Sequence, residues 1–157
     1  MDAAQDIKRI CVENGLWVAT AESLTAGHLQ SLIASVSGAS NFFSGGITAY
    51  NIDQKVKHLG VDRAHAASVD CVSPQVAAEM ARGATELFCV HIGVSTTGYA
   101  EPPAGSPTAF AYFAIWDARR AAVVREGRVA LTSSERVTNQ HEMARRVLSE
   151  LQAYLSA

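Results

Sequence analysis

The sequence predicts an α/β fold with a mixed sheet that carries helices on both faces. Through the first two-thirds of the chain, segments with apolar residues at helical spacing alternate with short apolar runs typical of buried strands. Two strand-like runs then follow each other directly before a final amphipathic helix, which makes the predicted sheet mixed. Because the sequence contains no repeat, low-complexity tract or linker, we expect one domain over residues 1–157.

Five elements are predicted in the first 60 residues. The helices carry apolar residues on one face, as Ile7, Ile10 and Cys11 do in the first, and glycine follows their ends, as at Gly15 and Gly60. The strands are short and apolar, or rich in residue types that suit a pleated surface. In chain order the elements are a helix over residues 3–12, a strand over 16–21, a helix over 25–36, a strand over 45–50 and a helix over 53–59.

The remaining elements are a long helix, three strands and a last helix. Ser73-Pro74 is a strong helix start, because serine caps the first turn and proline fits within it. The next strand is nearly all apolar, which indicates a central position, whereas Arg125–Arg128 interrupts the last strand as a predicted bulge or turn. The elements are a helix from residue 73 to 88, strands over 90–96, 109–116 and 121–131, and a helix over 138–155, with a Gly/Pro-rich loop over 98–107.

The composition argues against several classes of partner. The 13 basic and 15 acidic side chains give a net charge of -2, so nothing global favours nucleic acid or an anionic membrane. No segment approaches the ~20 apolar residues of a membrane helix, and the N-terminus lacks the basic and apolar regions of a signal peptide. We therefore expect a cytoplasmic protein that binds a small molecule, and homo-oligomer formation stays open.

Cysteine and histidine positions predict neither disulfides nor a metal site. The three cysteines, Cys11, Cys71 and Cys89, are odd in number and show no C-x-x-C spacing, which favours buried, apolar thiols in a reducing compartment. The five histidines show no ligand spacing either. We therefore expect no metal and no cofactor.

Three segments follow predicted strands, where open α/β sheets tend to bind ligands. These segments are residues 22–27, 50–55 and 97–103. In the first, amide N–H groups at the start of a helix could hold a phosphate or an oxyanion, and Ser23 could face the ligand. The alternative is that Ser23 or Thr25 only caps the helix.

The second segment pairs Tyr50 with Lys55. A serine nucleophile needs a group that accepts its proton, and a lysine kept neutral by burial or by neighbouring cations can do this, with the tyrosine as a relay. The alternative is a half-buried strand tyrosine and a solvated lysine. The third segment, Thr97–Pro103, could form a rigid ligand-facing loop or a plain surface connection.

Four ordered motifs give the sequence a specific resemblance over nearly its whole length. Residues 20–27 read T-A-E-S-L-T-A-G, and residues 71–81 and 97–102 supply the second half of the pattern. Between them, Phe43, Gly46, Tyr50, Lys55 and Leu59-Gly60-Val61 match the spacing F-x-x-G-x-x-x-Y-x-x-x-x-K-x-x-x-L-G-V. The chain thereby resembles the CinA C-terminal domain family, whose corresponding motifs are T-A-E-S-C-T-G-G, A-V-S-x-x-V-A-x-E-M-A and S-G-I-A-G-P.

The resemblance implies a three-layer α/β/α sandwich with a mixed, mainly parallel sheet, in a divergent, stand-alone member of the family. The family's free-standing members deamidate nicotinamide mononucleotide, so a metal-free amidohydrolase is implied. By the resemblance Ser23 attacks the carboxamide, Lys55 is the base and Tyr50 assists. Ammonia leaves, and water releases the acid. The implied substrate-binding residues are Glu22, Thr25, Gly27, Thr97, Gly98 and Arg136.

Departures from the family pattern leave two functional hypotheses. Leu24 and Ala26 replace a cysteine and a glycine, Ile52 replaces an asparagine, and Glu101 puts a carboxylate where a phosphate-bearing ligand would lie. In the segment after residue 134, only Arg136 survives as an anion ligand. The first hypothesis is an active amidohydrolase for nicotinamide mononucleotide or a related pyridine amide. The second is a catalytically lapsed or repurposed paralogue that acts as a ligand-binding or regulatory domain.

Overall fold

Five strands form one sheet: β1 (Val18–Glu22), β2 (Phe43–Thr48), β3 (Ile92–Tyr99), β4 (Ala109–Asp117) and β5 (Ala122–Leu131). The computed structural model describes residues 2–157 and places the strands in the order β2-β1-β3-β4-β5. Strands β2, β1 and β3 are parallel, while β4 is antiparallel to both β3 and β5. The predicted mixed, mainly parallel sheet is therefore confirmed, and the nearly all-apolar run is its central strand, β3.

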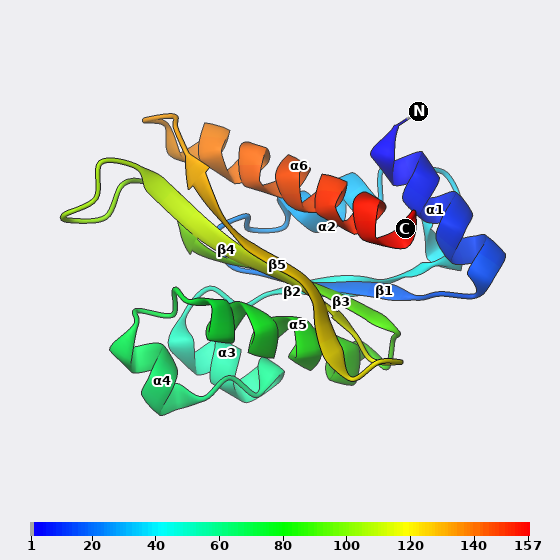
Figure 1. Cartoon of the computed structure of the whole chain (residues 1–157), viewed down its shortest axis with the longest axis horizontal. Helices are drawn as coiled ribbons and strands as arrows, with labels where there is room; N and C mark the ends of the chain where they lie inside the picture. Colours follow the sequence, from blue (N-terminus) through cyan, green and yellow to red (C-terminus); the bar gives the residue numbers. More distant parts are fainter. Residues whose placement is uncertain (1) are drawn as a thin grey trace.

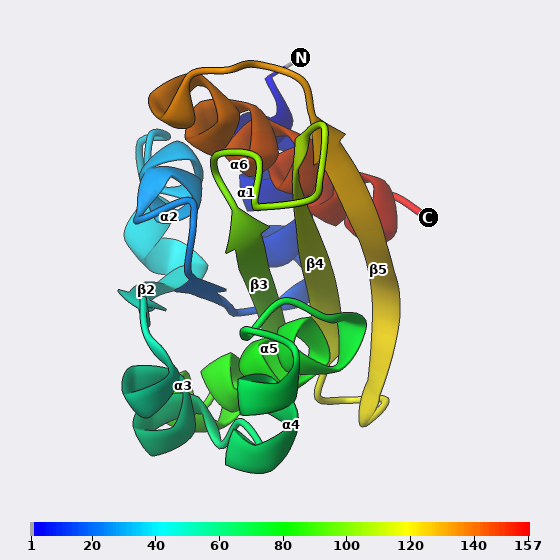
Figure 2. The same ribbon diagram turned by 90° about the vertical axis from the view of Figure 1, so that its left-hand side faces the viewer.

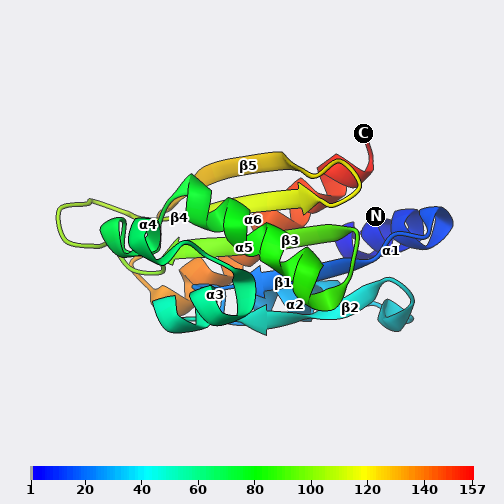
Figure 3. The ribbon, with the colours of Figure 1, turned by 90° about the horizontal axis from the view of Figure 1, so that it is seen from below.

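Helices cover both faces of the sheet (Figures 1 and 3). One face carries α1 (Ala3–Asn14), α2 (His28–Ile33) and α6 (Arg136–Leu155), and the other carries α3 (Ile52–Leu59), α4 (Arg63–Ser68) and α5 (Pro74–Phe88). This arrangement confirms the three-layer sandwich that the family resemblance implies. A short 3₁₀ turn, Ala39–Asn41, precedes β2. Within residues 2–157, no helix has both the length and the apolar character needed to cross a membrane.

Local sequence signals account for several helix ends. The Ser73 hydroxyl accepts the Val76 amide N–H at 3.1 Å, and Pro74 occupies the first turn of α5, as predicted. Gly15 and Gly60 follow α1 and α3 with φ angles of 64° and 67°, a left-handed conformation that glycine adopts without strain. The sequence therefore locates these helix ends closely.

The predicted start of α2 is wrong. The helix begins at His28 rather than at residue 25, because Ala26 and Gly27 have left-handed φ angles of 48° and 97°. A right-handed helix cannot include such residues, so the chain turns once more before α2 starts. The segment between β1 and α2 is consequently a tight turn rather than a helix opening.

Two further features differ from the sequence-based elements. The Arg125–Arg128 stretch does not interrupt β5; the pairing register shifts instead between Ile115 and Trp116 of β4, where β5 holds an extra residue. Helix α4 was not expected, because six residues are too few to show helical periodicity. It is capped by the Asp62 carboxylate, which accepts the His65 amide N–H at 2.9 Å.

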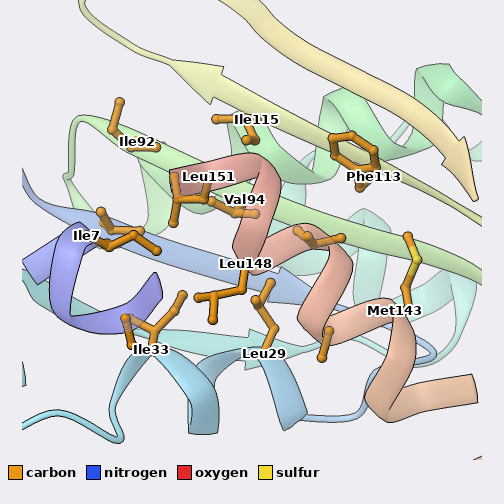
Figure 4. Close-up of a cluster of buried hydrophobic side chains, with 14 of the residues drawn as sticks. Ile7, Leu29, Ile33, Ile92, Val94, Phe113, Ile115, Met143, Leu148 and Leu151 are labelled. Carbon is orange, nitrogen blue, oxygen red and sulfur yellow. The ribbon is translucent and has the colours of Figure 1, made fainter. Parts of the chain in front are cut away.

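The main apolar core lies between the sheet and the layer of α1, α2 and α6 (Figure 4). Alternate residues of β3 and β4 point into it, since side chains alternate between the two faces of a strand. Each large aliphatic side chain buried here contributes about 1.5–3 kcal/mol to folding. The labelled core residues are Ile7, Leu29, Ile33, Ile92, Val94, Phe113, Ile115, Met143, Leu148 and Leu151.

Strand β1 is buried along its whole length, because helices cover both of its faces. Val18 belongs to the main core, whereas Ala19 and Ala21 belong to a second cluster with residues of α3, α4 and α5. The strand is therefore held from both sides. The residues that directly follow it, beginning with Ser23, leave the sheet from a fixed position.

The expectation of buried cysteines is right only for Cys11. Cys11 lies in the main core, Cys71 is half-buried and Cys89 is exposed, and all three are free thiols. Cys89 follows the last turn of α5 in a left-handed conformation, and that turn carries it to the surface. Tertiary position, rather than residue type, decides the exposure of the other two.

The contact between α3 and α5 gives a first prediction. Replacing a helical glycine with alanine normally stabilises a helix by about 1 kcal/mol. In α5, however, a Cβ on Gly83 would overlap the carbonyl oxygen of Leu59 at the end of α3. We expect Gly83→Ala to lower the free energy of unfolding by about 1–3 kcal/mol, as overpacking does, measured by urea denaturation. A gain in stability would show that α3 and α5 can move apart enough to admit the added methyl group at little cost.

Candidate active site

The carboxyl ends of the three parallel strands meet at one edge of the sheet. Ser23 directly follows β1, Tyr50 lies two residues after β2, and Thr97–Tyr99 end β3. Figure 2 faces this edge, with the β3–β4 loop and the start of α6 above α3 and α4. The segments line a cavity of about 760 Å³, together with part of α3 and α4.

Ser23 and Lys55 are in direct contact at the cavity floor. Their Oγ and Nζ atoms are 2.9 Å apart, and the two residues are only 6% and 1% exposed. The Lys55 Nζ also donates to the carbonyl oxygens of Ala49 at 2.9 Å and Tyr50 at 3.2 Å. The inner face of α3 therefore carries a lysine whose nitrogen is fixed by three oxygen partners from two other segments.

Burial lowers the pKa of the Lys55 ammonium below its usual 10.5, and Cys71 and Asp70 nearby offset part of this effect. A neutral amine has two N–H groups and one lone pair. The carbonyls of Ala49 and Tyr50 can accept both hydrogens, which leaves the lone pair for the Ser23 hydroxyl. The three contacts thus suit a neutral lysine that accepts the serine proton.

Glu22 holds the turn between β1 and α2 instead of facing the cavity. Its carboxylate is fully buried and accepts the Thr25 hydroxyl at 2.6 Å and the amide N–H groups of Gly27, Leu29 and Gln30 at 3.2, 2.9 and 2.9 Å. The amide groups at the start of α2, which the sequence suggested for a phosphate or oxyanion, are thereby occupied. Glu22, Thr25 and Gly27 shape the turn, and none of the three lines the cavity.

Thr96 of β3 was not singled out by the sequence, yet it fixes the backbone of Ser23. Its buried hydroxyl accepts the Ser23 amide N–H at 3.3 Å and shares a 2.8 Å hydrogen bond with the Thr25 hydroxyl. The neighbouring Thr97 donates its hydroxyl to the Cys71 carbonyl at 2.7 Å, and Gly98 also lines the cavity. Through these hydrogen bonds the central strand β3 holds the turn after β1 on one side of the site and Cys71 on the other.

Tyr50 and Arg136 meet at the rim of the cavity. Tyr50 is 51% exposed, and its hydroxyl bonds to the Arg136 guanidinium and not to Ser23 or Lys55. Arg136 also faces Glu101 of the β3–β4 loop, with 3.8 Å between the Arg136 Nη1 and the Glu101 Oε2. The contribution of Tyr50 to the Ser23–Lys55 contact is therefore its carbonyl oxygen, which holds the lysine nitrogen.

The segment before α5 adds two unexpected residues to the cavity wall. Asp70 and Cys71 both have left-handed backbones, with φ angles of 52° and 60°, and the Asp70 carboxylate accepts the Tyr99 hydroxyl at 3.0 Å. Burial raises the pKa of the Cys71 thiol, the charge of Lys55 lowers it, and Asp70 raises it again. Their proximity to Lys55 comes from the chain reversal between α4 and α5, which has no local motif.

Nearly the whole chain matches a single protein family. The family model of the CinA C-terminal domain matches residues 1–155. This chain belongs to the CinA C-terminal domain family. Among its relatives, the CinA-like proteins of Chlorobium limicola and Flavobacterium psychrophilum are 46% and 40% identical over 102 and 101 residues. These matches cover 65% and 64% of this chain but only 24% of each relative, so the chain spans about a quarter of their length.

Solved structures of CinA proteins share the fold. The competence/damage inducible protein CihA from Agrobacterium tumefaciens is 27% identical, with a TM-score of 0.87 over 100% of this chain and 97% of that one. A competence-damaged protein (CinA) superfamily protein from Klebsiella pneumoniae reaches a TM-score of 0.89 over 98% and 96% at 23% identity. At that identity, the second likeness speaks for the fold alone.

Two departures from the CinA family pattern lie in the turn after β1. Leu24, in place of the family's cysteine, is buried in the main core and enlarges it. Ala26, in place of a glycine, has a left-handed φ of 48°, which places its Cβ close to a carbonyl oxygen. The first departure adds apolar packing, and the second strains the backbone beside the nucleophile candidate.

The strain at Ala26 gives a second prediction. We expect Ala26→Gly to raise the free energy of unfolding by up to about 1 kcal/mol, because glycine adopts the left-handed conformation without a Cβ penalty. Thermal and urea denaturation measure the change. The matched control is Gly27→Ala, which should lower stability because its φ is 97°. Destabilisation by Ala26→Gly would mean that the Ala26 methyl group makes contacts worth more than the strain.

Proposed function

We propose that this protein is an amidohydrolase of the nicotinamide mononucleotide deamidase type, which converts a carboxamide into a carboxylate and ammonia. The observation that carries the proposal is the 2.9 Å contact between Ser23 Oγ and the buried Lys55 Nζ at the floor of the cavity. A hydroxyl nucleophile beside a base of lowered pKa is the arrangement that acyl transfer requires. We place this reaction in the cytoplasm, as the sequence led us to expect.

In the proposed reaction, neutral Lys55 takes the proton of the Ser23 hydroxyl as the oxygen attacks the carboxamide carbon. The carbonyls of Ala49 and Tyr50 stabilise the ammonium that forms. Lys55 then returns the proton to the leaving nitrogen, ammonia departs, and Ser23 carries the acyl group. A water molecule gives a proton to the same lysine as it attacks this ester, and the lysine passes that proton to the Ser23 oxygen as the ester bond breaks and the carboxylic acid leaves. No step requires a metal ion.

The backbone beside Ser23 supplies a donor for the oxyanion. Leu24 directly follows the nucleophile and lines the cavity, and its amide N–H donates to no other group among residues 2–157. The amides of Gly27, Leu29 and Gln30, by contrast, already donate to Glu22. We therefore propose the Leu24 N–H as the group that stabilises the negative oxygen of the tetrahedral intermediate.

A second candidate function, a ligand-binding or regulatory domain without turnover, has its own support. The Tyr50 hydroxyl bonds Arg136 and does not reach Ser23, while Glu101 faces the arginine that an anionic substrate would use. Both features alter the rim and leave the floor of the cavity intact. Turnover measurements separate the two candidates.

The third prediction concerns the catalytic pair. We expect Ser23→Ala and Lys55→Met each to reduce ammonia release from nicotinamide mononucleotide at least ~100-fold, because each removes one half of the proton transfer. Circular dichroism and urea denaturation check that the variants fold. The matched control is Lys57→Met, since this exposed lysine lies on the same helix, and its activity should be unchanged. Full turnover by Ser23→Ala would remove Ser23 from the nucleophile role.

The fourth prediction concerns pH. Because the base must be neutral and burial lowers its pKa, kcat/KM should rise with pH through one ionisation below 10.5. Asp70 favours the charged form of Lys55, so Asp70→Asn should move this rise to lower pH. Lys55→Arg should be inactive at every pH, since a guanidinium stays protonated. A profile that Asp70→Asn leaves in place would separate the ionisation from Lys55.

A further inference from the structure

The rim of the cavity brings opposite charges together from distant parts of the chain. Arg136 stands at the first turn of α6 and Glu101 in the loop between β3 and β4, yet their side chains approach to 3.8 Å. The Tyr50 hydroxyl bonds the same guanidinium from the segment after β2. Arg136, the cation at the rim that an anionic ligand would contact, is thus already flanked by the Glu101 carboxylate and the Tyr50 hydroxyl.

The charged side chains of the cavity wall offer a phosphate one cation at the rim, and that cation already faces a carboxylate. Among its lining residues the cavity has two basic side chains, Lys55 and Arg136, and two carboxylates, Asp70 and Glu101. Lys55 lies at the floor, where Ser23 and two backbone carbonyls occupy its nitrogen. Arg136 faces Glu101. A phosphate monoester, which carries a charge of about -1.5 to -2 at neutral pH, would meet a paired arginine and a repelling carboxylate.

The same wall suits a ligand without phosphate. The two carboxylates of the cavity wall, Asp70 and Glu101, attract a positive charge, such as that of a pyridinium ring, and do not repel a neutral amide. Ile52, where the CinA family has an asparagine, also lines the cavity and makes its wall more apolar. A volume of about 760 Å³ accommodates a nucleoside-sized molecule.

We propose that the cavity selects a phosphate-free carboxamide, neutral or cationic and up to the size of a nucleoside, and that Glu101 is the residue that sets this selectivity. The inference rests on the proposed function in that the same cavity presents the amide to Ser23. It differs in making the mononucleotide the poorer ligand, with repulsion at the rim as the reason. Glu101 acts on the phosphate position and takes no part in the reaction at the cavity floor.

The test compares two compounds that differ only in the phosphate, nicotinamide riboside and nicotinamide mononucleotide. Their affinities for the Ser23→Ala protein, which should not consume them, are measured by titration calorimetry. We expect the riboside to bind at least about tenfold more tightly. Adding Glu101→Gln should improve mononucleotide binding about tenfold and weaken binding of the cationic riboside by less than threefold. Glu126→Gln, which removes an exposed carboxylate from β5 away from the cavity, should change neither.

Salt provides a second readout of the same repulsion. The preference for the riboside should shrink as NaCl rises from 0.05 to 0.5 M (roughly 14 to 4 Å in Debye length), because ions screen the carboxylate from the phosphate. Tighter binding of the mononucleotide, a preference that Glu101→Gln leaves unchanged, or no binding of either compound would overturn the proposal. Ammonia release by the unmodified protein is measured separately. Its absence would count against the proposed hydrolysis and leave the binding comparison valid.

Discussion

The buried carboxylate of Glu22 organises the structure around the candidate site. Removing a carboxylate from water is costly unless hydrogen bonds replace its hydration, and here one hydroxyl and three amide N–H groups do so. These bonds close the turn after β1 and occupy the first amides of α2. Ser23 sits within this closed turn, so the position of its hydroxyl depends on Glu22, although Glu22 itself does not reach the cavity.

The second constraint is the burial of Lys55. A lysine in the interior requires acceptors for its nitrogen, and Ser23 and the carbonyls of Ala49 and Tyr50 provide them. The requirement ties α3 to the ends of β1 and β2. The packing of α3 on α5 through Gly83 therefore serves the site as well as the fold, because a displaced α3 would carry the lysine away from the serine.

The departures from the CinA family pattern fall into two groups with different consequences. Leu24 and Ala26 alter the packing and the strain of the turn while the Ser23–Lys55 contact is kept. Ile52 and Glu101 change the wall and the rim, where a substrate would be chosen. A fixed floor below an altered rim is the arrangement expected when chemistry is retained and specificity changes, which is why the phosphate position is the informative place to test.

The sequence by itself determined the α/β class, the positions of the five strands along the chain, and the caps at Ser73 and Gly60. Periodicity and capping are local properties, so a sequence pattern can reveal them. Family resemblance, rather than spacing, paired Ser23 with Lys55. Only the tertiary structure revealed Thr96 behind the serine and the Asp70–Cys71 segment beside the lysine. It also showed that the Tyr50 hydroxyl bonds to Arg136 and not to Ser23 or Lys55. These contacts join residues far apart in the chain, and strand register and the chain reversal before α5 decide them, so no local pattern could have predicted them.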